Sequence, residues 1–241
     1  MARITTALPR LALCAGALAG TLTGAPALAQ APFVPADFKV PAGLTTAGFK
    51  LQPTVAPVFS HDNPRAEPPA LAAGNIKVAS ANVLNYFTTF TNGQTASGAS
   101  GQGCSLGNSV AASNCRGADN LTEFTRQRDK IVQALLGLNA DVVGLMEIQN
   151  NGNAAAQNLV DALNAVAGAG TYAVTPLPVA FDASVGGSPT GTDAIRVALI
   201  HKPAKVTPQG SAMADTDPVH NRPPLAQAFS TPHGERLTVV V

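Results

Sequence analysis

The chain has 241 residues, of which 46% are hydrophobic and 12% charged, and its formal net charge is +1. This length is sufficient for a buried core. The near-neutral charge excludes a positive field over the whole molecule as the means of holding nucleic acid, so any such binding needs a local patch or a metal ion. Because tryptophan is absent and aromatic residues make up 5% of the chain, stacking platforms for single strands are also excluded.

The N-terminal 30 residues have the pattern of an export signal. Arg3 and Arg10 charge its start, an apolar run follows over 11–22, and a small-residue cleavage pattern ends at Ala29. The apolar run is shorter than the roughly 20 residues that a transmembrane helix needs. The sequence therefore predicts a signal peptide over 1–29, no stable membrane insertion, and a secreted protein, extracellular or periplasmic.

A lipid anchor at Cys14 is the alternative to soluble export. Leu13 disfavours it, because lipoprotein signals have a small residue immediately before the modified cysteine. Removing residues 1–30 takes away two arginines and no acidic residue, which leaves a formal charge of −1. The mature chain would therefore still lack a strong overall charge.

Residues 30–74 are rich in proline and alanine and show no sustained periodicity, which indicates a linker or an irregular arm. The pattern changes at Asn75, where a domain over 75–241 is predicted to begin. Residues 76–81 alternate as a strand does and continue into 82–87.

A polar loop follows over 92–118 and contains Cys104 and Cys115. Exported proteins meet oxidising conditions, so the pair predicts a local disulfide. A loop of this size is stabilised by about 3 kcal/mol in the chain-entropy picture. Half of a cysteine-based metal site is the alternative, which the absence of a nearby histidine disfavours.

A helix is predicted to begin after Asn120, with Glu123 completing a capping box. An apolar run of strand length follows over 141–146, and a second helix is predicted over 159–166. This order of elements predicts a layered α/β domain. Further strands are predicted at 172–177, 194–201, 225–230 and from 236.

Glu147 is the most informative candidate for chemistry. It directly follows an apolar run, where a buried carboxylate is costly unless it is paired or bound to a metal. Mg²⁺ takes one or two protein carboxylates and keeps positions open for water and phosphate oxygens. The alternative is that Glu147 is simply the first solvated residue after a strand.

Two further polar residues stand at predicted strand ends. Asn82 could orient a phosphate, a carboxylate or a metal-bound water, although asparagine is also a common turn former. Arg222 precedes two prolines that stiffen the chain, which favours a fixed guanidinium on a phosphate, with a surface salt bridge as the alternative. Spacing gives no histidine an acidic partner, so a Ser/His/Asp triad has no support.

Five segments, in this order along the chain, resemble the extracellular nucleases of the endonuclease/exonuclease/phosphatase superfamily, whose fold is that of deoxyribonuclease I. The segments cover 78–87, 115–119, 141–148, 191–197 and 222–227. The resemblance implies a four-layer α/β/β/α sandwich with the active site at one end of two packed sheets.

The resemblance also implies roles for individual residues. Asn82 and Glu147 correspond to catalytic, metal-binding positions, and Arg222 to an arginine that contacts the substrate phosphate. Asp193 and Arg196 lie in a region that faces the cleft in relatives. The implied cofactor is Mg²⁺, with Mn²⁺ or Ca²⁺ as alternatives, and the implied substrate is DNA, with RNA as an alternative.

Motifs that the family has after the strand ending at Val241 cannot be located in the sequence. They are an Asn-His pair, an Asp-x-Asn motif and a Ser-Asp-His segment. The resemblance therefore implies a truncated domain with negligible activity, because general bases and electrostatic groups each contribute several powers of ten in rate. A phosphatase or phospholipid phosphodiesterase of the same fold, or a non-catalytic module, are the alternatives.

Overall fold

The computed structural model describes residues 38–39, 52–53, 55, 74–178, 181 and 191–241. The predicted signal peptide and nearly all of the predicted arm lie outside these residues. The chain divides into two compact units, Met1–Pro64 and Arg65–Val241. In the first unit, β1 (Phe38–Lys39) pairs antiparallel with β2 (Gln52–Pro53). Among the helices of the described residues, none is both long and apolar enough to cross a membrane.

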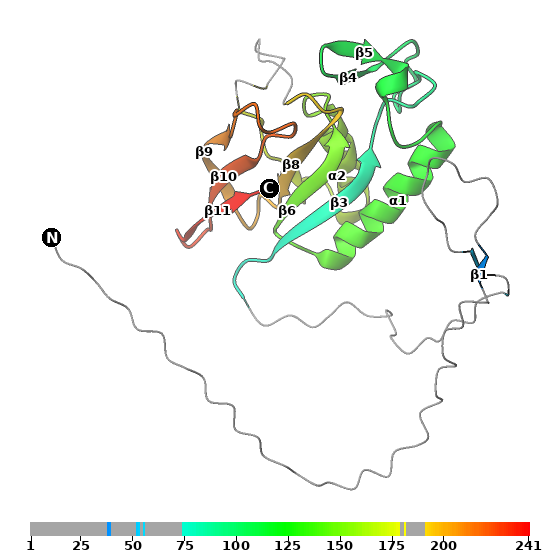
Figure 1. Ribbon diagram of the computed structural model, residues 1–241. Helices are drawn as coiled ribbons and strands as arrows, with labels where there is room; N and C mark the ends of the chain where they lie inside the picture. The colour runs from blue at the N-terminus through cyan, green and yellow to red at the C-terminus, as the bar shows by residue number, and fades with distance from the viewer. Residues whose placement is uncertain (1–37, 40–51, 54, 56–73, 179–180, 182–190) are drawn as a thin grey trace, which may run out of the picture. The chain divides into compact units, whose positions relative to one another are not determined.

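A four-stranded sheet is the centre of the second unit (Figure 1). Its strands, in spatial order, are β3 (Val78–Tyr86), β6 (Val142–Gln149), β8 (Ile195–His201) and β7 (Ala173–Val174). Strands β3 and β6 are parallel, and the other pairs are antiparallel. The first half of β6 is apolar at every position because both faces of the sheet are covered there.

Two helices cover one face of this sheet, α1 (Leu121–Leu138) and α2 (Ala154–Ala167). The predicted N-cap of α1 is confirmed, because the Asn120 side chain accepts from the Glu123 amide at 3.1 Å. The reciprocal bond of a capping box is shifted by one residue: Glu123 accepts from the amide of Asp119, not of Asn120, at 3.0 Å. Helix α2 begins five positions earlier than predicted, because the Asn151 side chain accepts from the Ala155 amide and so caps a turn that the apolar pattern does not mark.

A three-stranded antiparallel sheet packs on the opposite face of the central sheet. Its strands are β9 (Thr207–Ala214), β10 (Leu225–Ser230) and β11 (Arg236–Val240). Close packing between the sheets requires Gly144, because a Cβ there would lie 2.9 Å from a methyl group of Val241. The second unit therefore has a helix layer, a sheet and a second sheet, so the α/β class is confirmed. A second helix layer is not found among the described residues.

The predicted polar loop contains a small hairpin that was not expected. Strands β4 (Cys104–Leu106) and β5 (Ser109–Ala111) pair antiparallel, and the 3₁₀ turn η2 (Ala112–Asn114) follows them. Strand β9 was also not predicted, since proline and glycine interrupt its pattern. The predicted strand at 172–177 is reduced to the two residues of β7.

Candidate functional site at the carboxyl ends of β3 and β6

Strands β3 and β6 are parallel, so their carboxyl ends meet at one edge of the sheet. Asn82 lies opposite Met146, the residue before Glu147. Regular pairing then breaks off: the register of β3 shifts between Asn82 and Tyr86, and that of β6 against β8 shifts between Leu145 and Ile148. Both arrowheads point toward the end of the molecule where the β4–β5 hairpin lies (Figure 1).

Three non-glycine residues at this edge have left-handed backbone conformations. The φ angles are 53° at Leu84, 48° at Asn85 and 63° at Glu147. This conformation costs Leu84 and Glu147 about 1–2 kcal/mol each, whereas asparagine adopts it more readily. Strain of this kind persists where surrounding contacts impose it, commonly at functional sites. At Leu84 one such contact comes from Gln127 of α1, whose side-chain amide donates to the carbonyls of Val83 at 3.3 Å and Leu84 at 2.5 Å.

The Glu147 carboxylate is half-buried and held on one side only. Its Oε2 atom accepts from the Asn85 amide at 3.1 Å, and among the described residues no partner is found for Oε1. The Asn82 side-chain oxygen accepts from the Leu84 amide at 2.8 Å and is otherwise exposed. Carboxylate and amide oxygens are ligands that suit Mg²⁺, which needs only one or two carboxylates. These two residues therefore fit the ion chemically, although the described residues contain no cluster of three or more His, Cys, Asp or Glu side chains.

A charged cluster brings together Asp193 and Arg222, which were predicted as site residues, and Arg116, which was not. Asp193 forms ion pairs with Arg222 at 3.3 Å and with Arg116 at 3.0 Å. The carboxylate side chain is 15% exposed, whereas the two arginine side chains are 49% and 40% exposed. The backbone of Asp193 is also bonded: its amide donates to the Asn221 carbonyl at 3.3 Å, and its carbonyl accepts from the Asn150 side chain at 3.0 Å.

Gly191 allows the two loops of this cluster to approach each other. Its φ angle is 73°, and a Cβ there would collide with the carbonyl oxygen of Asn221 and the ring of Pro223. A side chain would therefore push the chain before Asp193 away from the chain that carries Arg222.

Gly117 connects the charged cluster to the Glu147 edge. Its φ angle is 94°, and its Cα lies so close to the Asn85 carbonyl that a Cβ would overlap that oxygen. Asn85 donates its amide to Glu147, and Arg116 immediately precedes Gly117. The segment that carries Arg116 therefore packs against the strand end whose Asn85 amide holds Glu147.

Gln149 holds the cysteine-containing segment against the same strand. It is 2% exposed, and its side-chain oxygen accepts from the amides of Thr88 at 2.8 Å and Thr89 at 3.1 Å. Its side-chain amide donates to Cys104 Sγ at 3.3 Å. The sulfur atoms of Cys104 and Cys115 lie within bonding distance, with Cα atoms 5.0 Å apart. Sequence reasoning missed Gln149, although a glutamine ending an apolar strand was a visible signal.

Arg196 is buried, unlike the two arginines of the charged cluster. It is 1% exposed, and its guanidinium donates to the carbonyl oxygens of Gly152 and Val197 and to the side-chain oxygen of Asn153. Burial lowers its pKa to about 10, so it stays protonated at neutral pH. Its N–H groups are directed to the turn before α2 and to the carbonyl of Val197, so Arg196 does not belong to the candidate site.

Two histidines acquire partners that spacing did not reveal. His220 Nε2 lies 3.2 Å from the Asp215 carboxylate, a partner that spacing did not assign. The hydrogen bond from the Asp217 amide is the main cause that lowers the pKa of Asp215, and the hydrogen bond with His220 is the second. His201 is 5% exposed and bonds the Thr175 hydroxyl at 3.1 Å, and burial lowers its pKa, as is typical of a histidine in a core.

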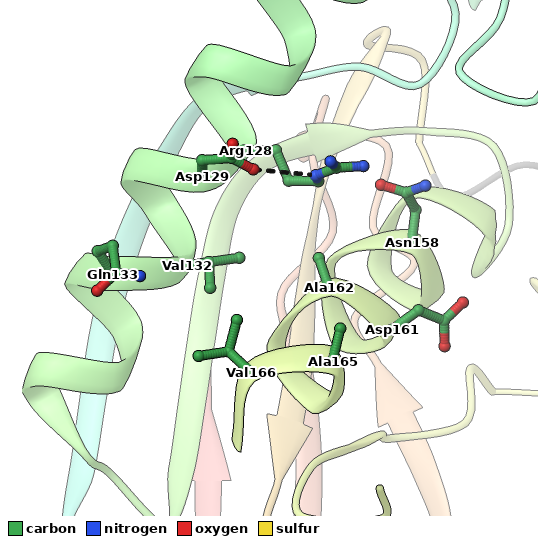
Figure 2. A pocket seen from close by; sticks show the side chains of 9 residues that line it. All are labelled: Arg128, Asp129, Val132, Gln133, Asn158, Asp161, Ala162, Ala165 and Val166. Carbon is green, nitrogen blue, oxygen red and sulfur yellow. Dashed lines mark ion pairs between the residues drawn. The ribbon is translucent and has the colours of Figure 1, made fainter. Parts of the chain in front are cut away.

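A shallow groove of about 500 Å³ lies between the two helices (Figure 2). An ion pair between Arg128 and Asp129, with N and O atoms 3.5 Å apart, stands at one end of it. The groove shares no residue with the site at the strand ends. Its lining consists of Arg128, Asp129, Val132, Gln133, Asn158, Asp161, Ala162, Ala165 and Val166.

No protein-family model matches the chain, and no curated protein matches it in sequence. Solved structures do match. They include the 2′,3′-cyclic phosphatase ANGEL2 (14% identity, TM-score 0.35, 48% of this chain and 31% of that chain). An endonuclease/exonuclease/phosphatase family protein from Bacteroides thetaiotaomicron (11%, 0.32, 48% and 41%) and the human Nocturnin catalytic domain (17%, 0.32, 49% and 42%) also match. The chain spans less than half the length of each of these structures.

Proposed function

We propose that this protein is a metal-dependent phosphodiesterase and that its substrate is nucleic acid, DNA in the first place. The proposal rests mainly on one observation: Glu147 has a left-handed backbone and a half-buried carboxylate held by the Asn85 amide, and Asn85 is packed against Gly117, the residue after Arg116 of the charged cluster. A carboxylate with an open oxygen suits a hard cation, and exposed guanidinium groups suit phosphate oxygens. Metal-dependent hydrolysis of a phosphodiester needs both a bound cation and a group that binds the phosphate.

Each residue has a distinct role in this proposal. Glu147 and Asn82 would hold Mg²⁺ through oxygen atoms, and the ion supplies Lewis-acid polarisation of a phosphoryl oxygen or activation of a water when it is bound. The Asn85 amide fixes the orientation of the Glu147 carboxylate. Arg222 binds a phosphate oxygen of the substrate through its guanidinium.

Binding of a labelled DNA duplex to the 241-residue chain tests this function without requiring turnover. We expect Mg²⁺ to tighten binding and EDTA to weaken it, because metal and phosphate share the site. Matched RNA, inositol phosphate and phospholipid vesicles identify the preferred ester. If Mg²⁺ strengthens the binding of none of them, the proposal is wrong. The same samples, assayed by plasmid nicking, test the expectation of negligible turnover by this chain, and rapid nicking would contradict it.

We also propose that the chain is exported and that Cys104 and Cys115 form a disulfide. Support comes from the N-terminal pattern and from the short distance between the two cysteines. After expression in a bacterial host, we expect the protein outside the cytoplasm, without residues 1–29. A thiol-alkylating reagent should label neither cysteine before reduction and both after it, as read by mass spectrometry. Full-length, labelled protein confined to the cytoplasm would contradict the proposal.

A further inference from the structure

The cluster of Arg116, Asp193 and Arg222 retains a positive charge after its ion pairs are counted. Two guanidinium groups share one carboxylate, which leaves one net positive charge. Asp193 is contacted by one nitrogen of each arginine, Nη2 of Arg116 and Nε of Arg222. A guanidinium has five N–H donors, so most donors of both side chains remain available, and both side chains are at least 40% exposed.

Asp193 is fixed more firmly than either arginine. Its side chain is the least exposed of the three, and its backbone amide and carbonyl are both hydrogen-bonded to neighbouring loops. Arg116 is further restrained by its neighbours, since Cys115 lies within bonding distance of Cys104 and Gly117 lies against Asn85. Guanidinium groups that are held before binding lose less conformational entropy on contact with a ligand.

We propose that Arg116 and Arg222 form a two-arginine clamp for the phosphodiester backbone, and that Asp193 is the positioning residue for both. This inference rests on the proposed function and extends it. It gives Arg116, which lies outside the predicted catalytic set, a direct contact with substrate. It also gives Asp193 a role opposite to that expected from its charge: a carboxylate that promotes the binding of an anion.

The sign of the effect of Asp193→Asn distinguishes positioning from simple charge. The variant raises the net charge by one, so charge alone predicts tighter DNA binding. Positioning predicts weaker binding, because both guanidinium groups lose their anchor. The experiment measures the affinity of the 241-residue chain for a 12-base-pair DNA duplex over a series of salt concentrations. EDTA is present throughout, so metal ions do not contribute to the comparison. Thermal unfolding of each variant checks that it remains folded.

For Arg116→Ala and Arg222→Ala, we expect weaker binding and a fall of about 0.9 in the slope of log affinity against log salt, the value for one lost phosphate contact. Arg126→Ala is the control, because Arg126 is an exposed arginine on α1 and its loss changes the net charge equally. Arg116→Lys should restore the slope but only part of the affinity, since lysine lacks the planar fork.

The outcomes separate the two proposals. If the unsubstituted chain binds the duplex neither in EDTA nor with Mg²⁺, the proposed function fails. If it binds, but Arg116→Ala behaves like Arg126→Ala, Arg116 is not part of a clamp. If Asp193→Asn binds more tightly, Asp193 is only an opposing charge. In either of the last two cases the inference is overturned while the proposed function remains.

Discussion

Replacing Glu147 with glutamine is expected to lower the affinity of the protein for Mg²⁺ or Mn²⁺ by about 10-fold to 100-fold or more. Mutation of a residue that only supports a metal ligand already causes a loss of this size. The substitution removes the negative charge but keeps the size of the side chain. The side-chain carbonyl oxygen of glutamine can still accept the Asn85 amide, so the strand end should keep its conformation. Titration with Mn²⁺, followed by water-proton relaxation, measures the change.

Asp129→Asn is the matched control for this experiment. It also removes one carboxylate charge, but the Asp129 side chain is 65% exposed and lies on α1, at the groove between the helices. We expect its metal affinity to equal that of the unsubstituted protein. Equal affinities in all three proteins would show that Glu147 does not bind the metal. If the proposed function holds, Glu147→Gln should also abolish any metal-dependent plasmid degradation.

Replacing Gly117 with alanine is expected to lower the free energy of unfolding by about 2–4 kcal/mol. A left-handed conformation costs an alanine about 1–2 kcal/mol, and the new Cβ must in addition displace the Asn85 carbonyl. Because the Asn85 amide donates to Glu147, the same substitution should weaken metal binding. Urea denaturation at neutral pH gives the change in stability.

Gly137→Ala provides a control with the opposite expected sign. Gly137 lies in the last turn of α1, where a Cβ would meet no atom within 4 Å. Alanine in a helix is favoured over glycine by roughly 0.5–1 kcal/mol, so this variant should be more stable than the parent. If both variants lose stability equally, the contact between Gly117 and Asn85 does not determine the effect at position 117.

Local signals in the sequence predicted the elements whose causes are local. The N-cap of α1 requires only Asn120 and the Glu123 amide, and the first half of β6 is marked by its own apolar run. Strand β9 could not be found in this way, because Pro208 and Gly210 interrupt its pattern and its pairing with β10 maintains it. The start of α2 was missed for a similar reason, since its cap lies outside the apolar repeat.

The candidate site was predictable only in part, because its geometry depends on contacts between distant segments. Asn82 and Glu147 follow apolar runs and Arg222 precedes one, and this is visible in the sequence, although their chemical roles stay predictions. Strands β3 and β6 continue past the strand ends predicted at Asn82 and Glu147. The ion pair between Arg116 and Asp193 joins two loops, and nothing in the sequence of either loop indicates this contact. Nor does any local pattern show that Glu147 leaves the extended conformation of its strand.

Gln127 has a consequence for anyone who wishes to move this site into another scaffold. Its side chain reaches from the helix layer to the carbonyls of Val83 and Leu84, so the unusual backbone at the strand end is held from behind. A graft that copied only the two strands and their polar residues would let this backbone relax to an ordinary extended form. The transferable unit therefore includes a helix that carries none of the residues proposed to bind metal or phosphate.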